Sequence, residues 1–342
     1  MARKTTRVFN TTQEDINKIN PNNLELMEEY LDYYSADHAE KSVKVIRSNL
    51  NIFFVWVLHN LNNKDFSEIK KRDLLKYQNY LSKNGLSPAR VRGLRSAISS
   101  MSNFIEDILA DDEERFENFR NNVNKIKAPK LVQVREKTVL TDEQVEAYLD
   151  NLVSRKKYSH ACALALAWAS GRRKSELLRF KVSFFDDKYL QYGCLYESPK
   201  KIKTKGSGKL GKPLTVYVLK PKFKKYLDLW LEERRRLGIP DTVDDLFVDE
   251  AGVPFGEARL QSYADTFSRE MNVDFYFHCL RHNFTTELLR QGIPAEVVKE
   301  LVGWESVEMV STYDDRSASE SFGMYFGEGG IKKVEVKSLT DL

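Results

Sequence analysis

Two segments in the second half of the chain place arginines beside residues that could orient them. The first is Gly171-Arg172-Arg173-Lys174-Ser175-Glu176-Leu177, where Arg173 stands at the expected start of a helix and Glu176 lies one turn later. Such a carboxylate could hold the guanidinium group and direct its N–H donors at a phosphate. The second is His278-Cys279-Leu280-Arg281-His282. His278 and Arg281 are three residues apart, so the start of a helix would present both to one centre.

Three further residues could complete a site that acts on a phosphate. Lys203 lies in a lysine-rich stretch, Trp304 follows Gly303, and Tyr313 comes nine residues after Trp304. A lysine can donate a proton, and a tyrosine hydroxyl becomes a nucleophile when a base removes its proton. Each candidate also has an ordinary structural explanation, since Trp304 could belong to the core, Tyr313 to an amphipathic surface and His278 to a helix cap. Their order along the chain therefore matters more than any one of them.

The lysine-rich stretch is the most unusual surface feature of the sequence. Residues 198–227 contain ten lysines and no acidic residue, and glycines interrupt the densest part, which includes Lys203, Lys205 and Lys209. A basic hairpin of this kind could lie along a polyanion. The alternative is a mobile, solvated loop. Uncompensated charge over thirty residues favours a polyanion partner, without distinguishing DNA from RNA.

Basic residues also recur at helical spacing in the first half of the chain. Steps of three place such residues on adjoining positions of one helix face, and two such helices side by side would form a positive saddle. The alternative is a solvated helix face, which is the usual position of Lys and Arg. The candidate DNA-binding residues of this half are Lys41, Lys44, Arg47, Arg90, Arg92 and Arg95.

The composition is that of a folded, water-soluble protein with two domains. The chain has 342 residues, of which 42% are hydrophobic and 30% charged, and its net charge is 54 − 50 = +4. No apolar run approaches the roughly 18–20 residues that a membrane-spanning helix needs. Three scattered cysteines do not form a disulfide framework or a zinc-binding pattern. We therefore expect no metal and no cofactor, and reduced thiols in a cytoplasmic protein.

The chain must fold as two units to bring these residues together. Helical periodicity over 21–121 predicts an all-helical domain, and a basic, aperiodic stretch with Pro129 predicts a linker over 122–138. Residues 139–325 predict a mixed α+β domain, with helices around β-like runs at 189–196 and 214–219. The fold class is thus mainly α, with one small β-sheet. Residues 1–20 are expected to be a flexible segment, and 326–342 a C-terminal tail after a glycine-rich hinge.

Taken in order, these motifs resemble the catalytic signature of the tyrosine recombinases, the phage integrase family. The resemblance rests on Arg173 before Lys-Ser-Glu-Leu, the lysine of a basic hairpin, His-x-x-Arg at 278–281, Gly303-Trp304 and Tyr313. It covers most of the chain, and residues 22–110 resemble that family's helical core-binding domain. Leu86-Ser87-Pro88-Ala89-Arg90-Val91 is also similar to the family, with weaker specificity.

The resemblance implies a role for each candidate. Tyr313 matches the nucleophile, Arg173 and Arg281 match the two catalytic arginines, and His278 matches the histidine of the His-x-x-Arg motif. Trp304 stands where most members have a second histidine. Its indole N–H can donate a hydrogen bond but cannot act as an acid or base. The sequence leaves one match open, since Lys205 rivals Lys203 as the catalytic lysine. Arg172 stands where members usually have an apolar residue and is not assigned a catalytic role.

The implied activity is DNA cleavage and rejoining through a 3′-phosphotyrosine intermediate, without metal or ATP, on behalf of a phage or another mobile element. The implied partners are double-stranded DNA, a homotetramer on two duplexes, and accessory DNA-bending proteins. A type IB topoisomerase, a telomere-resolving enzyme and a non-catalytic DNA-binding relative are the alternatives with a related fold. A helical protein-interaction scaffold, whose lysines are only solvated, is the alternative of another class.

Overall fold

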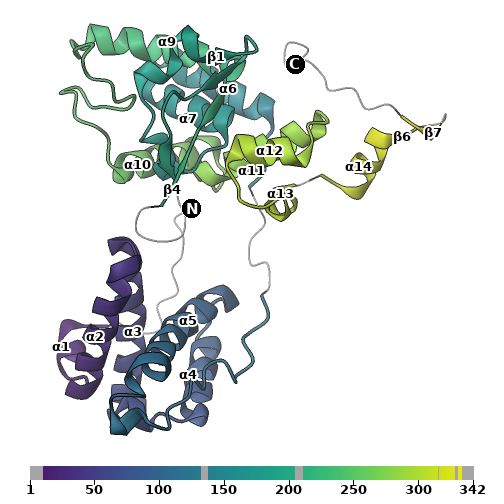
Figure 1. Cartoon of the computed structure of the whole chain (residues 1–342). Coiled ribbons are helices and arrows are strands. Elements are labelled where there is room, and N and C mark those ends of the chain that lie inside the picture. Colours follow the sequence, from purple (N-terminus) through teal and green to yellow (C-terminus); the bar gives the residue numbers. More distant parts are fainter. Residues whose placement is uncertain (1–10, 132–137, 205–210, 315, 328–329, 333–342) are drawn as a thin grey trace. The chain divides into compact units, whose positions relative to one another are not determined.

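In a computed structural model, the chain divides into two compact units, each with its own hydrophobic core (Figure 1). The structure describes residues 11–131, 138–204, 211–314, 316–327 and 330–332. Residues 11–131 form the first unit, and the described residues from 138 to 204 and from 212 onward form the second. The all-helical half and the mixed half of the expected fold are both confirmed.

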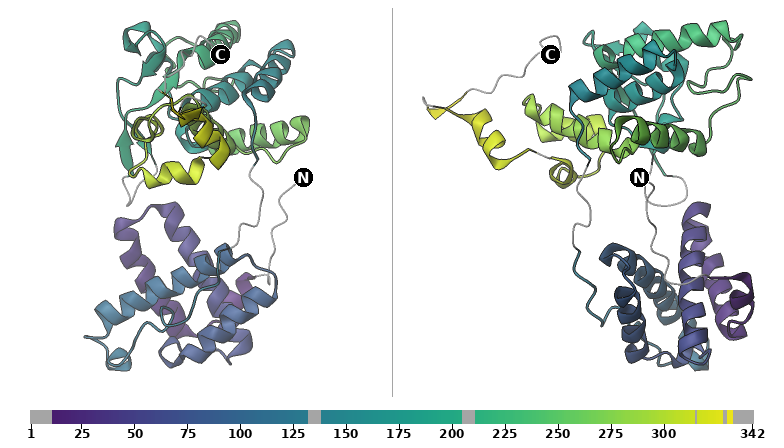
Figure 2. Two further views of the ribbon diagram at one scale, coloured as in Figure 1. Left: turned by 90° about the vertical axis from the view of Figure 1, so that its right-hand side faces the viewer. Right: turned by 180° about the vertical axis from the view of Figure 1, so that it is seen from behind.

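The first unit is a bundle of helices in every view (Figures 1 and 2). Helix α3 contacts α1, α2 and α5, and α5 also contacts α4. The helices are α1 (Gln13–Asn17), α2 (Pro21–Asp37), α3 (Glu40–Asn60), α4 (Lys71–Lys83) and α5 (Pro88–Phe104). A π-helical turn over Ile105–Leu109 and 3₁₀ turns at Phe66–Glu68 and Glu114–Phe116 complete the unit.

Local sequence explains how these helices begin and what they bury. Helix α5 starts with Pro88 in its first turn, and the Ser87 hydroxyl accepts a hydrogen bond from the Arg90 N–H at 3.2 Å. Aromatic side chains fill the bundle, with the rings of Phe53 and Tyr77 packed edge to face. The core extends into the segment expected to be a linker, because Val123 and Ile126 are buried among these helices.

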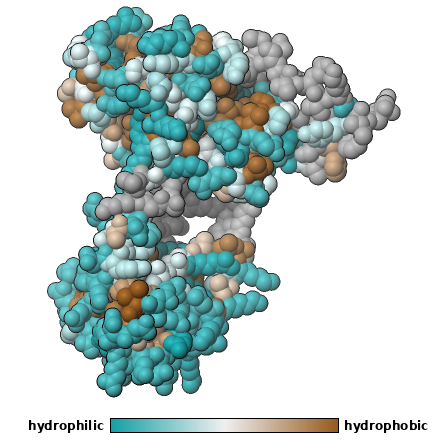
Figure 3. Space-filling model, viewed as in Figure 1, coloured by the Kyte–Doolittle hydropathy of each residue, from teal (hydrophilic) through white to brown (hydrophobic). Residues whose placement is uncertain are grey.

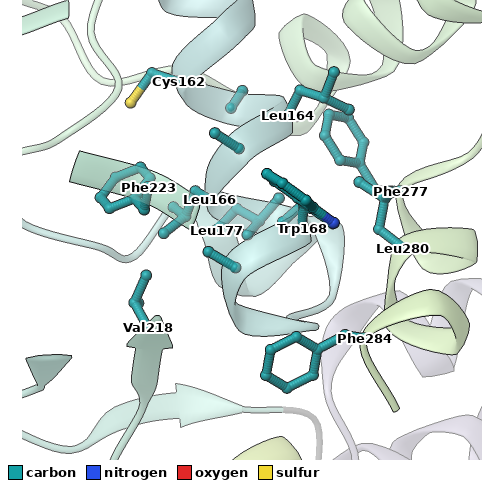
Figure 4. Close-up of a cluster of buried hydrophobic side chains, with 14 of the residues drawn as sticks. Cys162, Leu164, Leu166, Trp168, Leu177, Val218, Phe223, Phe277, Leu280 and Phe284 are labelled. Carbon is teal, nitrogen blue, oxygen red and sulfur yellow. The ribbon is translucent and has the colours of Figure 1, made fainter. Parts of the chain in front are cut away.

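The second unit is built around one central helix, α7 (Tyr158–Ser170). The helices of this unit are α6 (Asp142–Ser154), α7, α8 (Lys174–Leu177), α9 (Lys220–Arg236), α10 (Glu257–Met271), α11 (Phe277–Arg290), α12 (Ala295–Val302), α13 (Glu308–Tyr313) and α14 (Ala318–Tyr325). Residues 161–170 of α7 are all buried, and α6, α9 and α11 pack against this helix. Figure 4 shows Leu164, Trp168 and Phe284 among the buried side chains of this core. The small side chains of α7 allow its neighbours to approach closely.

The strands are shorter than the sequence predicts. The expected strand over 189–196 is a hairpin of β1 (Leu190–Gln191) and β2 (Leu195–Glu197), because Tyr192 and Gly193 both take positive φ angles and reverse the chain. The expected strand over 214–219 is likewise divided, between β4 (Lys212–Leu214) and β5 (Tyr217–Leu219). One sheet has the antiparallel order β1-β2-β5, and β4 pairs with β3 (Ile202–Thr204) in a second.

The C-terminal part of the chain continues past α13 and α14 into a short hairpin. Strands β6 (Phe326–Gly327) and β7 (Gly330–Ile331) pair antiparallel. The last residues of the expected tail, 333–342, lie outside the described residues. None of the described helices has the length and apolar character required to span a bilayer.

Candidate active site

The turn between α7 and α8 carries the first arginine. Gly171 ends α7 with φ of +58°, and a Cβ there would lie 2.6 Å from Cδ1 of Phe284. Arg173 then begins α8, and its side chain donates from Nη1 to Oε1 of Glu176 at 3.0 Å. Glu176 is fully buried and also accepts the Arg173 backbone N–H at 3.2 Å. The buried carboxylate therefore fixes both the backbone and the guanidinium group of Arg173.

Helix α11 presents His278 and Arg281 on adjoining turns. Nε2 of His278 lies 2.9 Å from the hydroxyl oxygen of Tyr313, which is hydrogen-bonding distance. Burial, and next the positive charge of Arg281, lower the pKa of His278 to about 4. The imidazole is therefore neutral at pH 7. A neutral imidazole can accept the phenolic proton, which is the requirement for activating Tyr313.

Arg281 is a fully buried charged group of the site. It is 0% exposed, and its Nη1 donates to the carbonyl oxygen of Gly171 at 3.1 Å. Its Nε and Nη2 find no hydrogen-bond partner among the described residues. Burial, and next the charge of Arg173, lower its pKa to about 9, so the group remains protonated at neutral pH. The site thus holds a charged guanidinium with donors to offer to an anion.

Tyr313 and Trp304 form an aromatic cluster beside Arg281. Their ring centroids are 4.6 Å apart, and the guanidinium carbon of Arg281 lies 4.8 Å from the Trp304 ring centroid and 5.8 Å from that of Tyr313. Both rings are buried, and the indole Nε1 of Trp304 has no hydrogen-bond partner among the described residues. The structure therefore brings Arg173, His278, Arg281, Trp304 and Tyr313 into one region from four separate segments.

The candidate lysines are placed less completely. Lys203 lies on β3, is exposed, and stands opposite Pro213 of β4. Strand β3 lies beside α8, the helix that Arg173 begins. Lys205 and Lys209 lie outside the described residues. The choice between Lys203 and Lys205 as the catalytic lysine therefore stays a prediction.

The basic residues of α3 and the start of α5 are held by near neighbours. Lys44 pairs with Glu40 at 2.6 Å, and Nη2 of Arg47 donates to Glu28 at 2.7 Å. Arg90 donates to Asn49 at 2.8 Å. Lys41 is exposed, and hydrophilic side chains cover most of the face of this unit seen in Figure 3. Exposed pairs of this kind are weak enough to exchange for a phosphate.

Two arginines further along α5 have a clear role inside the chain. Nε of Arg92 donates to the carbonyl oxygen of Pro129 at 2.8 Å, and Nη2 of Arg95 donates to those of Val123 and Ile126 at 2.9 and 2.6 Å. These bonds hold the segment after residue 122 against the bundle. The sequence assigned both arginines to DNA binding, which remains a prediction for them.

Sequence reasoning did not select three residues that shape the site. Thr286 donates its hydroxyl to the carbonyl oxygen of Tyr313 at 3.0 Å, and the ring of His282 lies 4.3 Å from the Tyr313 ring, centroid to centroid. Arg172 was quoted only as an unusual neighbour, and it is buried. His282 could have been found, because it lies four residues after His278 and so shares its helix face. Nothing in the sequence distinguishes Thr286 from other core threonines.

Comparison with known proteins supports one family. The sequence profile of the phage integrase family matches residues 138–320. The SPbeta prophage-derived recombinase-like protein YomM of Bacillus subtilis (strain 168) is 31% identical over 291 residues, which cover 84% of this chain and 81% of YomM. A tyrosine recombinase of Thermosipho africanus (strain TCF52B) is 24% identical over 307 residues, with coverage of 87% and 96%.

A solved structure shares the fold. It is the XerH site-specific recombinase bound to its palindromic difH substrate in a post-cleavage complex. It matches with a TM-score of 0.62 and 20% identity, over 82% of this chain and 78% of XerH. The family profile spans more than half of the sequence, including the segments that carry the five residues of the site. The chain therefore belongs to the phage integrase family, the tyrosine recombinases.

Proposed function

We propose that this protein is a site-specific recombinase that cuts and rejoins double-stranded DNA through a covalent bond to Tyr313. The observation that carries this proposal is the 2.9 Å contact between the Tyr313 hydroxyl and His278, beside a buried Arg281 with unpaired donors. A nucleophile, a neutral base and an anion-binding group are the three parts that attack on a phosphodiester needs.

In the proposed reaction, the Tyr313 oxygen attacks phosphorus while His278 Nε2 takes the phenolic proton. The bond from phosphorus to the 5′ oxygen breaks, and that oxygen receives a proton from Lys203. The products are a 3′-phosphotyrosine and a 5′-hydroxyl. Arg173 and Arg281 would donate to the non-bridging oxygens, where negative charge increases in the transition state. One ester replaces another, so a second 5′-hydroxyl can reverse the step without ATP.

The proposed setting follows from the family and from the chain's charge. Strand exchange between two duplexes requires four cuts, and one nucleophile per chain therefore implies four protomers on two duplexes. The similarity to YomM, which is described as prophage-derived, supports a role in a phage or another mobile element. Accessory DNA-bending proteins and a cytoplasmic, nucleoid-associated location belong to the same proposal. The lysine-rich stretch at 198–227 provides charge for a DNA backbone.

The test is covalent capture of DNA on the purified full chain. We expect the wild type to form an adduct that survives denaturation and to yield one recurring sequence when the trapped DNA is read. Tyr313→Phe should form no adduct but still bind the same DNA, because only the attacking oxygen is lost. Tyr325→Phe is the matched control, since Tyr325 is exposed and should leave the adduct unchanged.

The outcomes separate the alternatives. Relaxation of any supercoiled plasmid without exchange between sites would instead indicate a type IB topoisomerase, and closed hairpin ends would indicate a telomere-resolving enzyme. Binding without any adduct would identify a non-catalytic relative. A failure to bind DNA would favour the protein-interaction scaffold.

A further inference from the structure

Arg172 is a buried charge that the proposed reaction does not use. Its side chain is 1% exposed, and its Nη2 donates to the carbonyl oxygen of Leu301 at 2.9 Å and to that of Thr215 at 3.4 Å. Burial lowers its pKa to about 10, so it stays protonated at neutral pH. Burying a charge costs free energy that an apolar side chain would avoid. One nitrogen, Nη2, donates to carbonyl oxygens of two segments that are distant in sequence, which suggests that Arg172 joins those segments. Its Nε has no hydrogen-bond partner among the described residues.

The first of these segments leads directly to Trp304. Leu301 lies in the last turn of α12, where carbonyl groups lack partners within the helix and a positive charge is favourable. Gly303 ends the helix with φ of +75°. A Cβ on Gly303 would lie 2.8 Å from Nη1 of Arg172 and 2.9 Å from Cδ1 of Leu214. Arg172 and β4 therefore meet at the residue before Trp304, and glycine is required there for space as well as for its backbone angle.

The second segment leads to the proposed general acid. Thr215 directly follows β4, and β4 pairs with β3, where Lys203 stands opposite Pro213. Strand β3 also lies beside α8, which begins at Arg173. Arg172 thus lies in the turn that leads to Arg173, and its guanidinium group binds the end of the helix that leads to Trp304 and the residue that follows the β3–β4 strand pair.

We propose that Arg172 is a positioning residue that fixes the Gly303–Trp304 turn and the β3–β4 strand pair against the Arg173 turn. Its direct contacts are with backbone carbonyls, so it acts through its neighbours and not on the phosphate. Its charge also lies within electrostatic range of Arg281, whose pKa it helps to lower. The catalytic part of this inference rests on the proposed recombinase function, whereas the structural part does not.

The structural part is tested by fluorine NMR on the full chain labelled with 5-fluorotryptophan. The chain has four tryptophans, Trp56, Trp168, Trp230 and Trp304, and Trp304→Phe assigns the resonance of the last. Arg172→Met keeps most of the side-chain volume but cannot donate a hydrogen bond. We expect it to shift or broaden the Trp304 resonance. A folded Arg172→Met with an unchanged Trp304 resonance would overturn the proposal.

A second buried arginine provides the matched control. Arg234 is 5% exposed and donates to the carbonyl oxygens of Val243, Asp245 and Leu246. The Trp230 indole donates to the same Leu246 oxygen at 2.8 Å. Arg234→Met should therefore shift the Trp230 resonance and leave the Trp304 resonance in place. The same response from both variants would mean that Arg172 acts only through general stability.

The catalytic part is tested by single-turnover cleavage of the DNA recovered from the covalent adduct, at a temperature where each variant is folded. Misplaced catalytic groups can cost on the order of 100-fold, so we expect Arg172→Met to be about 10- to 100-fold slower than wild type. Arg234→Met should stay near the wild-type rate. Wild-type cleavage by a folded Arg172→Met would refute the catalytic part, whereas no cleavage by the wild type itself would refute the proposed function.

If Arg172→Met does not fold, Arg172→Lys tests the positioning role of Arg172. Lysine keeps the charge, but its shorter side chain cannot place a donor where Nη2 of Arg172 binds both carbonyl oxygens. We expect a smaller displacement of the Trp304 resonance and a cleavage rate between those of wild type and Arg172→Met. A lysine variant identical to wild type in both measurements would overturn the proposal, because the position of the guanidinium group would then have no effect on the Trp304 turn or on cleavage.

Discussion

Replacing Trp304 with phenylalanine separates the two roles that this residue can have. The buried indole packs 4.6 Å from the Tyr313 ring, centroid to centroid, and its Nε1 donor has no partner among the described residues. Phenylalanine keeps most of the packing and removes the donor. Because the unpaired donor is a cost to the free protein, its removal should offset part of the stability lost with the smaller ring.

The expected loss of cleavage rate follows from the free energy of one charge-assisted hydrogen bond. If the indole donates to the phosphate only when DNA is bound, its loss removes about 1.5–3 kcal/mol of transition-state stabilisation. At about 1.4 kcal/mol per factor of ten, Trp304→Phe should slow cleavage about 10- to 100-fold. Trp304→His keeps a donor and should retain substantial activity. Trp304→Ala loses donor and packing and should lower the free energy of unfolding by about 3–5 kcal/mol.

The assay is single-turnover formation of the Tyr313 adduct on a DNA that traps it, with the unfolding free energy measured on the same preparations. Rates should rank wild type, then His, then Phe, then Ala. A Phe variant that cleaves as fast as wild type would show that the indole N–H has no catalytic part and that Trp304 is simply core.

Three further predictions concern the charged groups of the site. Arg173→Ala and Arg281→Ala should each slow cleavage by at least about 100-fold, as expected when an oxyanion donor is lost, and near-normal single-turnover rates would refute the phosphate-binding assignment. Lys203→Ala should slow cleavage of ordinary DNA much more than cleavage of a 5′-phosphorothiolate, because a sulfur leaving group needs no proton. If the phosphorothiolate selectively rescues neither Lys203→Ala nor Lys205→Ala, another residue is the general acid. The pKa of His278 in the folded protein, about 4, lies below its ordinary value of about 6.5. The unfolded chain therefore binds this proton more readily, so the His278 contribution to stability is complete above about pH 6.5 and decreases as the pH falls towards 4. His278→Gln should accordingly flatten the decline of the unfolding free energy between pH 6.5 and 4, and an unchanged slope would contradict the assignment.

Local sequence signals were sufficient for most of the helices. Pro88 after Ser87 predicts the start of α5, and Gly171 predicts the end of α7, because these residues satisfy or release backbone groups at helix ends. Leu280, Phe284 and Leu288 recur at four-residue steps, which predicts one helix face in the core, and all three are buried. Such signals depend on neighbours in sequence, which is why they can be read without a structure.

The strands and the linker depended on contacts that sequence does not display. The run at 189–196 reverses at Tyr192, a residue type in which a positive φ is uncommon and hard to anticipate. Val123 and Ile126 lie in an aperiodic, basic segment, yet they are buried because Arg95 binds the carbonyls of that segment across the bundle. Side chains that fold a loop onto a domain leave no periodic pattern.

The distribution of charge within the site could not be predicted either. Glu176 is fully buried and binds Arg173 directly, and its charge partly offsets the lowering of the pKa values of Arg172 and Arg281 by burial. Three guanidinium groups thus share this carboxylate, and Arg281 keeps two unpaired donor atoms among the described residues. Excess buried charge and unpaired donors both destabilise a free protein, and a bound phosphodiester would relieve both. The feature that weakens the fold locally is therefore the same one that would bind the substrate. It is visible only in the structure, because the sequence gives the number of arginines but not the burial that makes their charges costly.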